Sequence, residues 1–308
     1  MKIEEVIGKS PIISQTLECK TITPLLMHGK ESKKTAQLRV SSFTGLFRYW
    51  FRALQSSNSK IVYEEESKLF GGTSKNSIKS PLLVTVTPAL SAKDNKYNTR
   101  PHAPYKKPQS IVPGFPEDTS FQLHIQTFIK DEIFIDTLFT YAKLSFYLGG
   151  FGQRSRRGFG SIEITNNQQP ETPEQWLSYI QQLISSVSKL QFKQINNNLL
   201  VTKEHRTIRH PQLLGIYIGN GYDTANEALI KINQTSSVVL KKYGPILGDI
   251  GGKGKKLSSP LVVSVKRIGK FYYPIVTEVH NTKNPNRYDI TKYNHAKRKF
   301  LTEVGATY

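Results

Sequence analysis

The chain has 308 residues and a formal net charge of +20, with 43 lysines and arginines against 23 aspartates and glutamates. Such an excess is typical of a protein that binds a polyanion, most often nucleic acid, although it can also serve solubility alone. Apolar residues make up 37% of the chain, which argues against global disorder. The single cysteine, Cys19, excludes an intrachain disulfide and a thiolate metal cluster. With no apolar run of signal-peptide or membrane-span length, we expect a cytoplasmic protein without a membrane partner.

Charge is distributed unevenly along the chain. Residues 1–165 hold 23 basic against 14 acidic residues, residues 201–308 hold 18 against 7, and residues 166–200 hold two of each. Two basic blocks therefore flank a neutral segment that is rich in glutamine and asparagine. We predict two domains, residues 1–165 and residues 166–308, joined near residues 166–172.

Hydrophobic periodicity predicts an alternation of strands and helices. Alternating apolar and polar residues predict strands at 14–23, 81–87, 120–128, 160–165, 213–218, 261–265 and 271–279. Helical spacing predicts helices at 43–55, with Ser41–Ser42 as N-cap, at 133–148 and at 224–243. The proline- and lysine-rich residues 91–118 are expected to form a long loop. In the first helix we expect Phe47 and Trp50 to be core residues.

One segment of the first half resembles a segment of the second. FGGTSKNSIKSPLLVTV begins at Phe70 and IGGKGKKLSSPLVVSV begins at Ile250, and each joins two glycines, a basic loop, Ser-Pro-Leu and an alternating strand. The match is short enough to arise by chance, but it favours duplication of one α+β unit. Each copy would place helices on one face of a small antiparallel sheet, which is the ferredoxin-like arrangement.

The segment Gly149–Gly160, GGFGQRSRRGFG, is the strongest candidate for binding RNA. Its glycines allow backbone N–H groups to approach an anion, and arginine guanidinium groups suit phosphate. The two phenylalanines either stack on bases or anchor the loop in the core. We take as candidates Gly149, Gly150, Gly152, Arg154, Arg156 and Arg157. The alternative is a tight turn between a helix and a strand, with solvated arginines.

Two further groups of basic residues are candidates for phosphate contacts. Arg48 and Arg52 lie one turn apart on the helix at 43–55, which Arg39 precedes. The loop GGKGKK carries Lys253, Lys255 and Lys256. For both groups a merely solvated charged surface is an equal alternative. For the basic segment 287–299, a frayed terminal helix is favoured over a contact with RNA.

Catalysis has weak support in the sequence. The histidines show no metal-ligand spacing and no accompanying acidic cluster, so we expect no metal and no cofactor. His28, with Lys30 beside it, is the one plausible general base for metal-free RNA cleavage.

Several segments together resemble the RAMP superfamily, the repeat-associated proteins of CRISPR defence. They are SSFTGLFRYWFRAL from Ser41, LFGG from Leu69, SPLLV from Ser80 and LGGFGQRSRRGFGSI from Leu148. They occur in the family's order, and the match covers residues 14–165. Within the superfamily the chain looks most like subunit one of the Cmr complex, the type III-B RNA-guided effector. The resemblance implies an α+β fold of two tandem ferredoxin-like domains with antiparallel sheets and a basic cleft.

The resemblance also implies a function in antiviral defence. The chain would be a non-catalytic subunit that holds the 3′ region of the guide RNA and the paired target RNA, next to other RAMP subunits of the complex. Two alternatives stay open. One is a metal-free endoribonuclease that processes repeat RNA with His28 as general base, and the other is a scaffold that contacts only protein.

Overall fold

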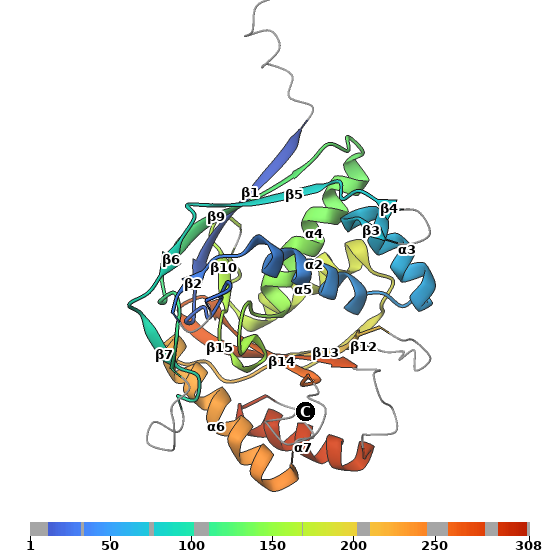
Figure 1. The fold of residues 1–308 in the computed structure, drawn as a ribbon. Helices are drawn as coiled ribbons and strands as arrows, with labels where there is room; N and C mark the ends of the chain where they lie inside the picture. The colour runs from blue at the N-terminus through green and yellow to red at the C-terminus, as the bar shows by residue number, and fades with distance from the viewer. Residues whose placement is uncertain are drawn as a thin grey trace, which may run out of the picture.

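The structure, a computed structural model, describes residues 12–31, 34–73, 77–101, 111–167, 169–201, 210–244, 258–280 and 289–306. Its main elements lie in four layers, in the order sheet, helices, sheet, helices (Figure 1). The α+β class with antiparallel sheets is therefore confirmed.

The first sheet has the strand order β10-β1-β9-β5, and all its pairs are antiparallel. Its strands are β1 (Ile13–Thr21), β5 (Leu82–Thr87), β9 (Ser120–Thr127) and β10 (Ile162–Ile164). Helix α2 (Val40–Ala53) connects the first two strands, together with α3 (Ser59–Phe70), and α4 (Glu132–Leu148) connects the last two. Leu17 and Cys19 face the helices because side chains alternate along a strand, whereas Glu18 between them is exposed.

The second sheet has the order β11-β12-β13-β15-β14 and is also antiparallel. Its strands are β11 (Phe192–Ile195), β12 (Asn198–Val201), β13 (Gln212–Ile218), β14 (Leu261–Ile268) and β15 (Phe271–His280). One face packs on α2, α4 and α5 (Pro173–Val187), and the other on α6 (Ala225–Tyr243), which also contacts α7 (Ile290–Glu303). A capping box between Thr224 and Glu227 starts α6.

Three short two-stranded sheets complete the described structure. They pair β2 (Ala36–Gln37) with β6 (Ser91–Ala92), β3 (Gly72–Thr73) with β4 (Ser77–Ile78), and β7 (Lys96–Asn98) with β8 (Ile111–Pro113). The predicted loop at 91–118 thus contains three short strands in its described part. Strands β6 and β7 have no buried residue, so no hydrophobic pattern indicated them, and the three residues of β8 are too few to show one.

Two helices were not predicted from the sequence, and the start of a third was predicted at the wrong residue. Helix α2 begins at Val40 after Arg39, and no side chain caps it, so the predicted Ser41–Ser42 cap is wrong. Helices α3 and α5 were not predicted, and the second lies in the neutral segment, directly after the expected domain junction at residues 166–172. Phe47 and Trp50 are buried, which confirms them as core residues.

One hydrophobic cluster joins both halves of the chain. It contains residues of the first sheet and of α2, α4 and α5, together with Leu213, Ile216 and Ile275 of the second sheet. The division of the chain at residue 165 stays a prediction.

Polar contacts also join the halves at the carboxyl end of α4. The Lys266 ammonium group, on β14, donates to the carbonyl groups of Phe146 and Gly149, the latter at 2.9 Å. The hydroxyl of Thr277, on β15, donates to the carbonyl of Leu148 at 2.9 Å. Helix-terminal carbonyls have no partner within their helix, so these donors remove the cost of burying them.

The buried Lys266 predicts a specific dependence of stability on pH. Burial lowers the pKa of Lys266 from 10.5 to about 7. Between these values the unfolded chain holds more protons than the folded one, so the free energy of unfolding rises with pH. This group alone should add about 2 kcal/mol between about pH 7 and pH 9. Urea unfolding of the wild type and of Lys266→Met checks this, because the variant should lose that part of the slope. Equal slopes would contradict it.

Candidate nucleic-acid interface

The loop between α4 and β10 has a backbone that requires glycine. Gly152, Gly158 and Gly160 have φ angles of +78°, +87° and +65°, and Arg154 itself is left-handed at +62°. A Cβ atom on Gly160 would lie 1.9 Å from the carbonyl oxygen of Phe151. These glycines therefore fit the turn that the sequence analysis offered as the alternative to anion binding.

Several N–H groups of this loop are already donated to the protein. Phe151 N–H bonds to Gly160 O at 2.9 Å, and Gly160 N–H bonds to Pro24 O at 2.9 Å. Gln153 N–H reaches Leu26 O at 2.7 Å, and Gly158 N–H reaches Val263 O at 2.8 Å. A nest formed by these four amides is therefore not available to an anion. Phe151 and Phe159 are buried, so they anchor the loop and do not stack on bases.

The three arginines of the loop are half-buried and are bonded to distant segments. Arg154 Nε and Nη2 donate to the carbonyl of Thr99 at 2.9 and 2.7 Å. Arg156 donates to the carbonyl of Ser259, and its guanidinium group lies 5.2 Å from the ring centre of Tyr49. Arg157 Nη1 lies 3.3 Å from the Ser259 hydroxyl. Each guanidinium has five donors, so these contacts leave donors for phosphate at Arg154 and Arg156, which are half-buried.

Burial also acts on the charge of these arginines. It lowers the pKa of Arg154, with a further contribution from Arg100, and it lowers the pKa of Arg157 to about 10. Both groups remain cationic at neutral pH. A phosphate placed there would relieve their mutual repulsion.

The arginines of α2 are held by a buried glutamate. Glu66, on α3, lies 2.7 Å from Arg52 and 3.3 Å from Arg48. Arg48 also donates to the carbonyls of Phe70 and Gly71 at the end of α3. These contacts give both arginines a structural role, and their contact with RNA stays a prediction.

Arg39 and His28 lie together where α2 begins. Arg39 is exposed, and its Nη1 donates to the backbone carbonyl of His28 at 3.2 Å. His28 Nε2 lies 2.7 Å from the carbonyl of Pro113, which can only accept, so this nitrogen carries the proton. The remaining ring nitrogen is the one that a catalytic role would have to use.

Some predicted residues lie outside the described part of the chain. They are Lys253, Lys255 and Lys256, together with the second copy of the internal repeat up to residue 257. Tyr49 and Lys266 were missed by the sequence analysis. The position of Tyr49 in the arginine-bearing helix could have indicated a contact with an arginine. Nothing in the sequence distinguishes Lys266 from a surface lysine.

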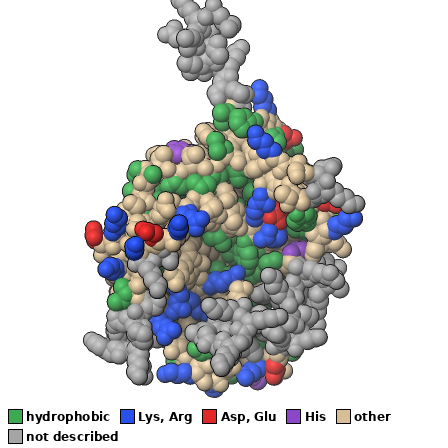
Figure 2. Space-filling model, in the orientation of Figure 1, with side chains coloured by type: hydrophobic (Ala, Val, Ile, Leu, Met, Phe, Trp, Pro, Cys, Tyr) green, Lys and Arg blue, Asp and Glu red, His purple; other side chains and the backbone are tan. Residues whose placement is uncertain are grey.

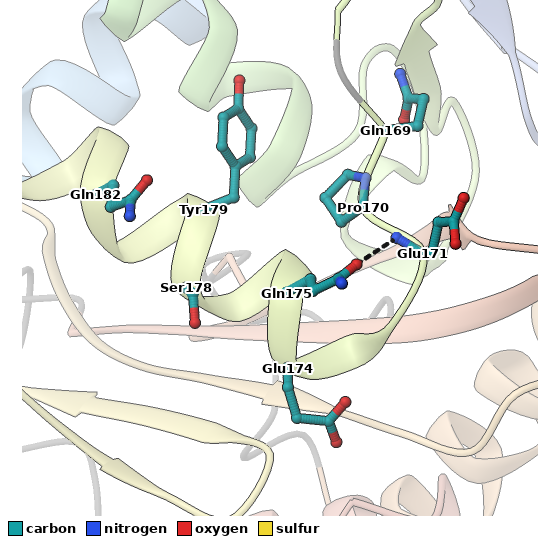
Figure 3. A pocket seen from close by; sticks show the side chains of 8 residues that line it. All are labelled: Gln169, Pro170, Glu171, Glu174, Gln175, Ser178, Tyr179 and Gln182. Carbon is teal, nitrogen blue, oxygen red and sulfur yellow. Dashed lines mark hydrogen bonds between the residues drawn. The ribbon is translucent and has the colours of Figure 1, made fainter.

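Basic side chains are visible on the face of the molecule that Figure 2 shows. They lie around a hollow that exposes hydrophobic side chains, and acidic side chains lie beside some of them. A different hollow, of about 620 Å³, lies along α5 (Figure 3). It is lined by Gln169, Pro170, Glu171, Glu174, Gln175, Ser178, Tyr179 and Gln182. With two glutamates and no basic side chain, it does not suit phosphate.

The described residues show two further absences. None of their helices is long and apolar enough to cross a membrane. Within the same part of the chain, no group of three or more His, Cys, Asp and Glu side chains is arranged to hold a metal ion.

Comparison with known proteins gives consistent matches. Residues 18–163 match the family model described as the RAMP superfamily. The CRISPR system Cmr subunit Cmr1-1 of Pyrococcus furiosus is 27% identical over 164 residues, which are 49% of this chain and 47% of that protein. The aligned sequence thus spans about half the length of this curated relative.

Two solved structures share the fold over nearly the whole chain. The crystal structure of Cmr1 from Pyrococcus furiosus, in its apo form, has a TM-score of 0.63 at 17% identity and covers 96% of this chain and 98% of its own. A chain in the cryo-EM structure of the type III-B Cmr-beta bound to cognate target RNA has a TM-score of 0.60 at 12% identity, covering 95% and 99%.

Substitution of Gly160 tests whether the loop is structural. Gly160→Ala should lower the free energy of unfolding by at least about 2 kcal/mol. Alanine would have to adopt the positive φ of this position, and its Cβ atom would clash with the Phe151 carbonyl. Gly45→Ala is the matched control, since Gly45 is exposed in α2 with nothing within 4 Å of the added Cβ. It should stabilise by about 0.5–1 kcal/mol. Thermal and urea unfolding measure both, and a neutral Gly160→Ala would contradict the structural role.

Substitution of Glu66 tests the role of Arg48 and Arg52. Glu66→Gln removes the charge that both guanidinium groups contact and should lower the free energy of unfolding by about 1.5–3 kcal/mol. Glu65→Gln, at the exposed neighbouring position, should change it by less than about 0.5 kcal/mol. Urea unfolding gives both values. If Glu66→Gln lowered the free energy of unfolding no more than Glu65→Gln, the contacts of the two arginines with Glu66 would not contribute to stability.

Proposed function

We propose that this chain is a RAMP-superfamily protein, whose model residues 18–163 match, and a non-catalytic, RNA-binding subunit of a type III-B Cmr complex. The observation that carries the proposal is the likeness to Cmr1 along 96% of the chain, combined with a net charge of +20. Its ligands are the 3′ region of the guide RNA and the paired target RNA, and its partners are other RAMP subunits. It acts in the cytoplasm, in antiviral defence.

Binding in this proposal depends on side chains and not on a nest of loop amides. Arg39 is exposed, and Arg154 and Arg156 keep donors that the protein does not use. Together these three arginines would border a basic cleft, whereas Gly149 and Gly150 are buried and serve the packing of the loop. Arg157 adds positive charge beside them, and the pair Arg48 and Arg52 keeps one net positive charge after its contact with Glu66. Contacts to phosphate and ribose suit a guide RNA, because its sequence varies.

We further propose that each half of the chain is a ferredoxin-like unit. In the first half the order β1, α2, β5, β9, α4, β10 and the sheet order β10-β1-β9-β5 support it. In the second half β13, α6, β14, β15 and α7 follow the same order, and β13-β15-β14 repeats the sheet order. In the first sheet β10 lies next to β1. In the second sheet the corresponding position, next to β13, is occupied by β12, a strand that precedes the unit in the sequence.

The non-catalytic assignment is supported by the contacts of His28. Its protonated Nε2 is bonded to Pro113, and its own carbonyl holds Arg39, so both groups serve to join the segment before α2 to β8. A histidine fixed in this way has a sufficient structural reason to be there.

Binding to single-stranded RNA should depend steeply on salt. Affinity measured by filter binding from about 50 to about 300 mM salt should fall, with a slope of about −0.7 for each phosphate contacted. Arg39→Gln and Arg156→Gln should each make the slope shallower and weaken binding equally for RNAs of different sequence. RNA recovered after incubation should be intact.

Arg298→Gln is the matched control for these variants. It removes the same charge from an exposed position on α7, in the layer farthest from the first sheet (Figure 1). It should leave the salt slope unchanged. Absence of binding, a flat salt response, or cleavage that His28→Ala abolishes would each overturn the proposal.

A further inference from the structure

Strand β5 leaves one side of the first sheet open. It ends the strand order β10-β1-β9-β5, and none of the described residues pairs with its other side (Figure 1). Its six residues, LLVTVT, carry no charge, and their register with β9 runs without a bulge. Proteins usually protect such an edge with lysine, proline or a bulge, because it readily pairs with another strand.

Hydrogen bonds at the opposite margin of the sheet show which backbone groups of β5 face the open edge. Thr165 N–H bonds to Glu18 O at 2.7 Å, and Asn166 Nδ2 bonds to Thr16 O at 2.9 Å. Thr16 and Glu18 therefore direct their backbone groups away from β9. In an antiparallel sheet successive residues bond to alternate sides, so the β1 residues between them, such as Leu17, bond to β9.

The same alternation continues through β9 to β5. Leu123 lies opposite Leu17 and bonds to β1, so its neighbour His124 bonds to β5, where its partner is Thr85. Val84 and Val86 flank Thr85 and consequently direct their N–H and C=O groups to the open edge. These four groups form a template for one short strand.

The surroundings of the edge favour a protein partner. Ser80 Oγ bonds to both the N–H and the C=O of Leu82 at 3.2 Å, which closes one end of the template. On the outer face, Leu83 and Phe128 are 46% and 57% exposed. Backbone groups beside apolar side chains suit an extended peptide, whereas phosphate would find no positive charge on the strand.

We propose that an extended strand of another protein subunit pairs with the β5 edge and continues the first sheet. The inference rests on the proposed function in that it requires a complex with different subunits. A second copy of the chain is a poorer partner, because it would bring a charge of +20 against an equal charge. A less basic subunit meets no such repulsion.

Hydrogen exchange tests the inference without any substitution. In the isolated chain the amide hydrogens of Val84 and Val86 should exchange quickly, since they face solvent. In the complex assembled with its natural partner subunits they should exchange at least about tenfold more slowly. Equal exchange in an assembled complex would overturn the inference and leave the proposed function intact.

A pair of substitutions gives an independent measurement. Leu83→Lys places a charge beside the edge, and Val238→Lys places one at an equally exposed apolar position, 44% exposed on α6. The first variant should be incorporated into the complex at least about tenfold less than the wild type, and the second should match the wild type. Equal thermal midpoints would show that both variants fold.

Three other outcomes would also decide the question. Equal incorporation of both variants would overturn the strand inference. A dimer of the isolated chain that Leu83→Lys dissociates would assign the edge to a second copy and overturn the assignment to another subunit. If the wild type joins no complex at all, the proposed function fails, and the inference fails with it.

Discussion

The carboxyl end of α4 is buried between two sheets, and the donors that make this possible come from the second sheet. Lys266 and Thr277 bond to the carbonyls of Phe146, Leu148 and Gly149. Without them three polar groups would be buried unpaired, at a cost of about 1–3 kcal/mol each. Because the loop begins where α4 ends, the path of the loop depends on the same contacts.

The loop in turn determines where positive charge appears on the surface. Its glycines allow the chain to turn back within hydrogen-bonding distance of residues 24–26, and its arginines reach Thr99 and Ser259 in other parts of the chain. The guanidinium groups are thereby held in place before any ligand binds. Preorganised cations lose little side-chain entropy on binding, which favours a stable grip on a phosphate backbone.

The two ends of the first sheet differ in chemistry as well as in position. At the β10 margin, Asn166 and Thr165 satisfy the backbone groups of β1 beyond the short strand β10. At the β5 margin the described residues leave the edge open beside exposed apolar side chains. Charge near an open strand edge hinders pairing with another strand, so the uncharged β5 margin is the one suited to a partner strand.

The amino-acid sequence by itself determined the fold class, most of the strands of the two main sheets, helices α2, α4 and α6, and the burial of Phe47 and Trp50. These features follow from the spacing of apolar residues within short segments of the chain, which the sequence shows directly. The partners of the arginines were decided by tertiary structure alone. Glu66 is 14 residues from Arg52, and Ser259 is 103 residues from Arg156. No local pattern records which distant carbonyl or carboxylate the chain path brings to a guanidinium group, so the same glycine- and arginine-rich segment fitted both a binding loop and a structural turn until the fold placed it.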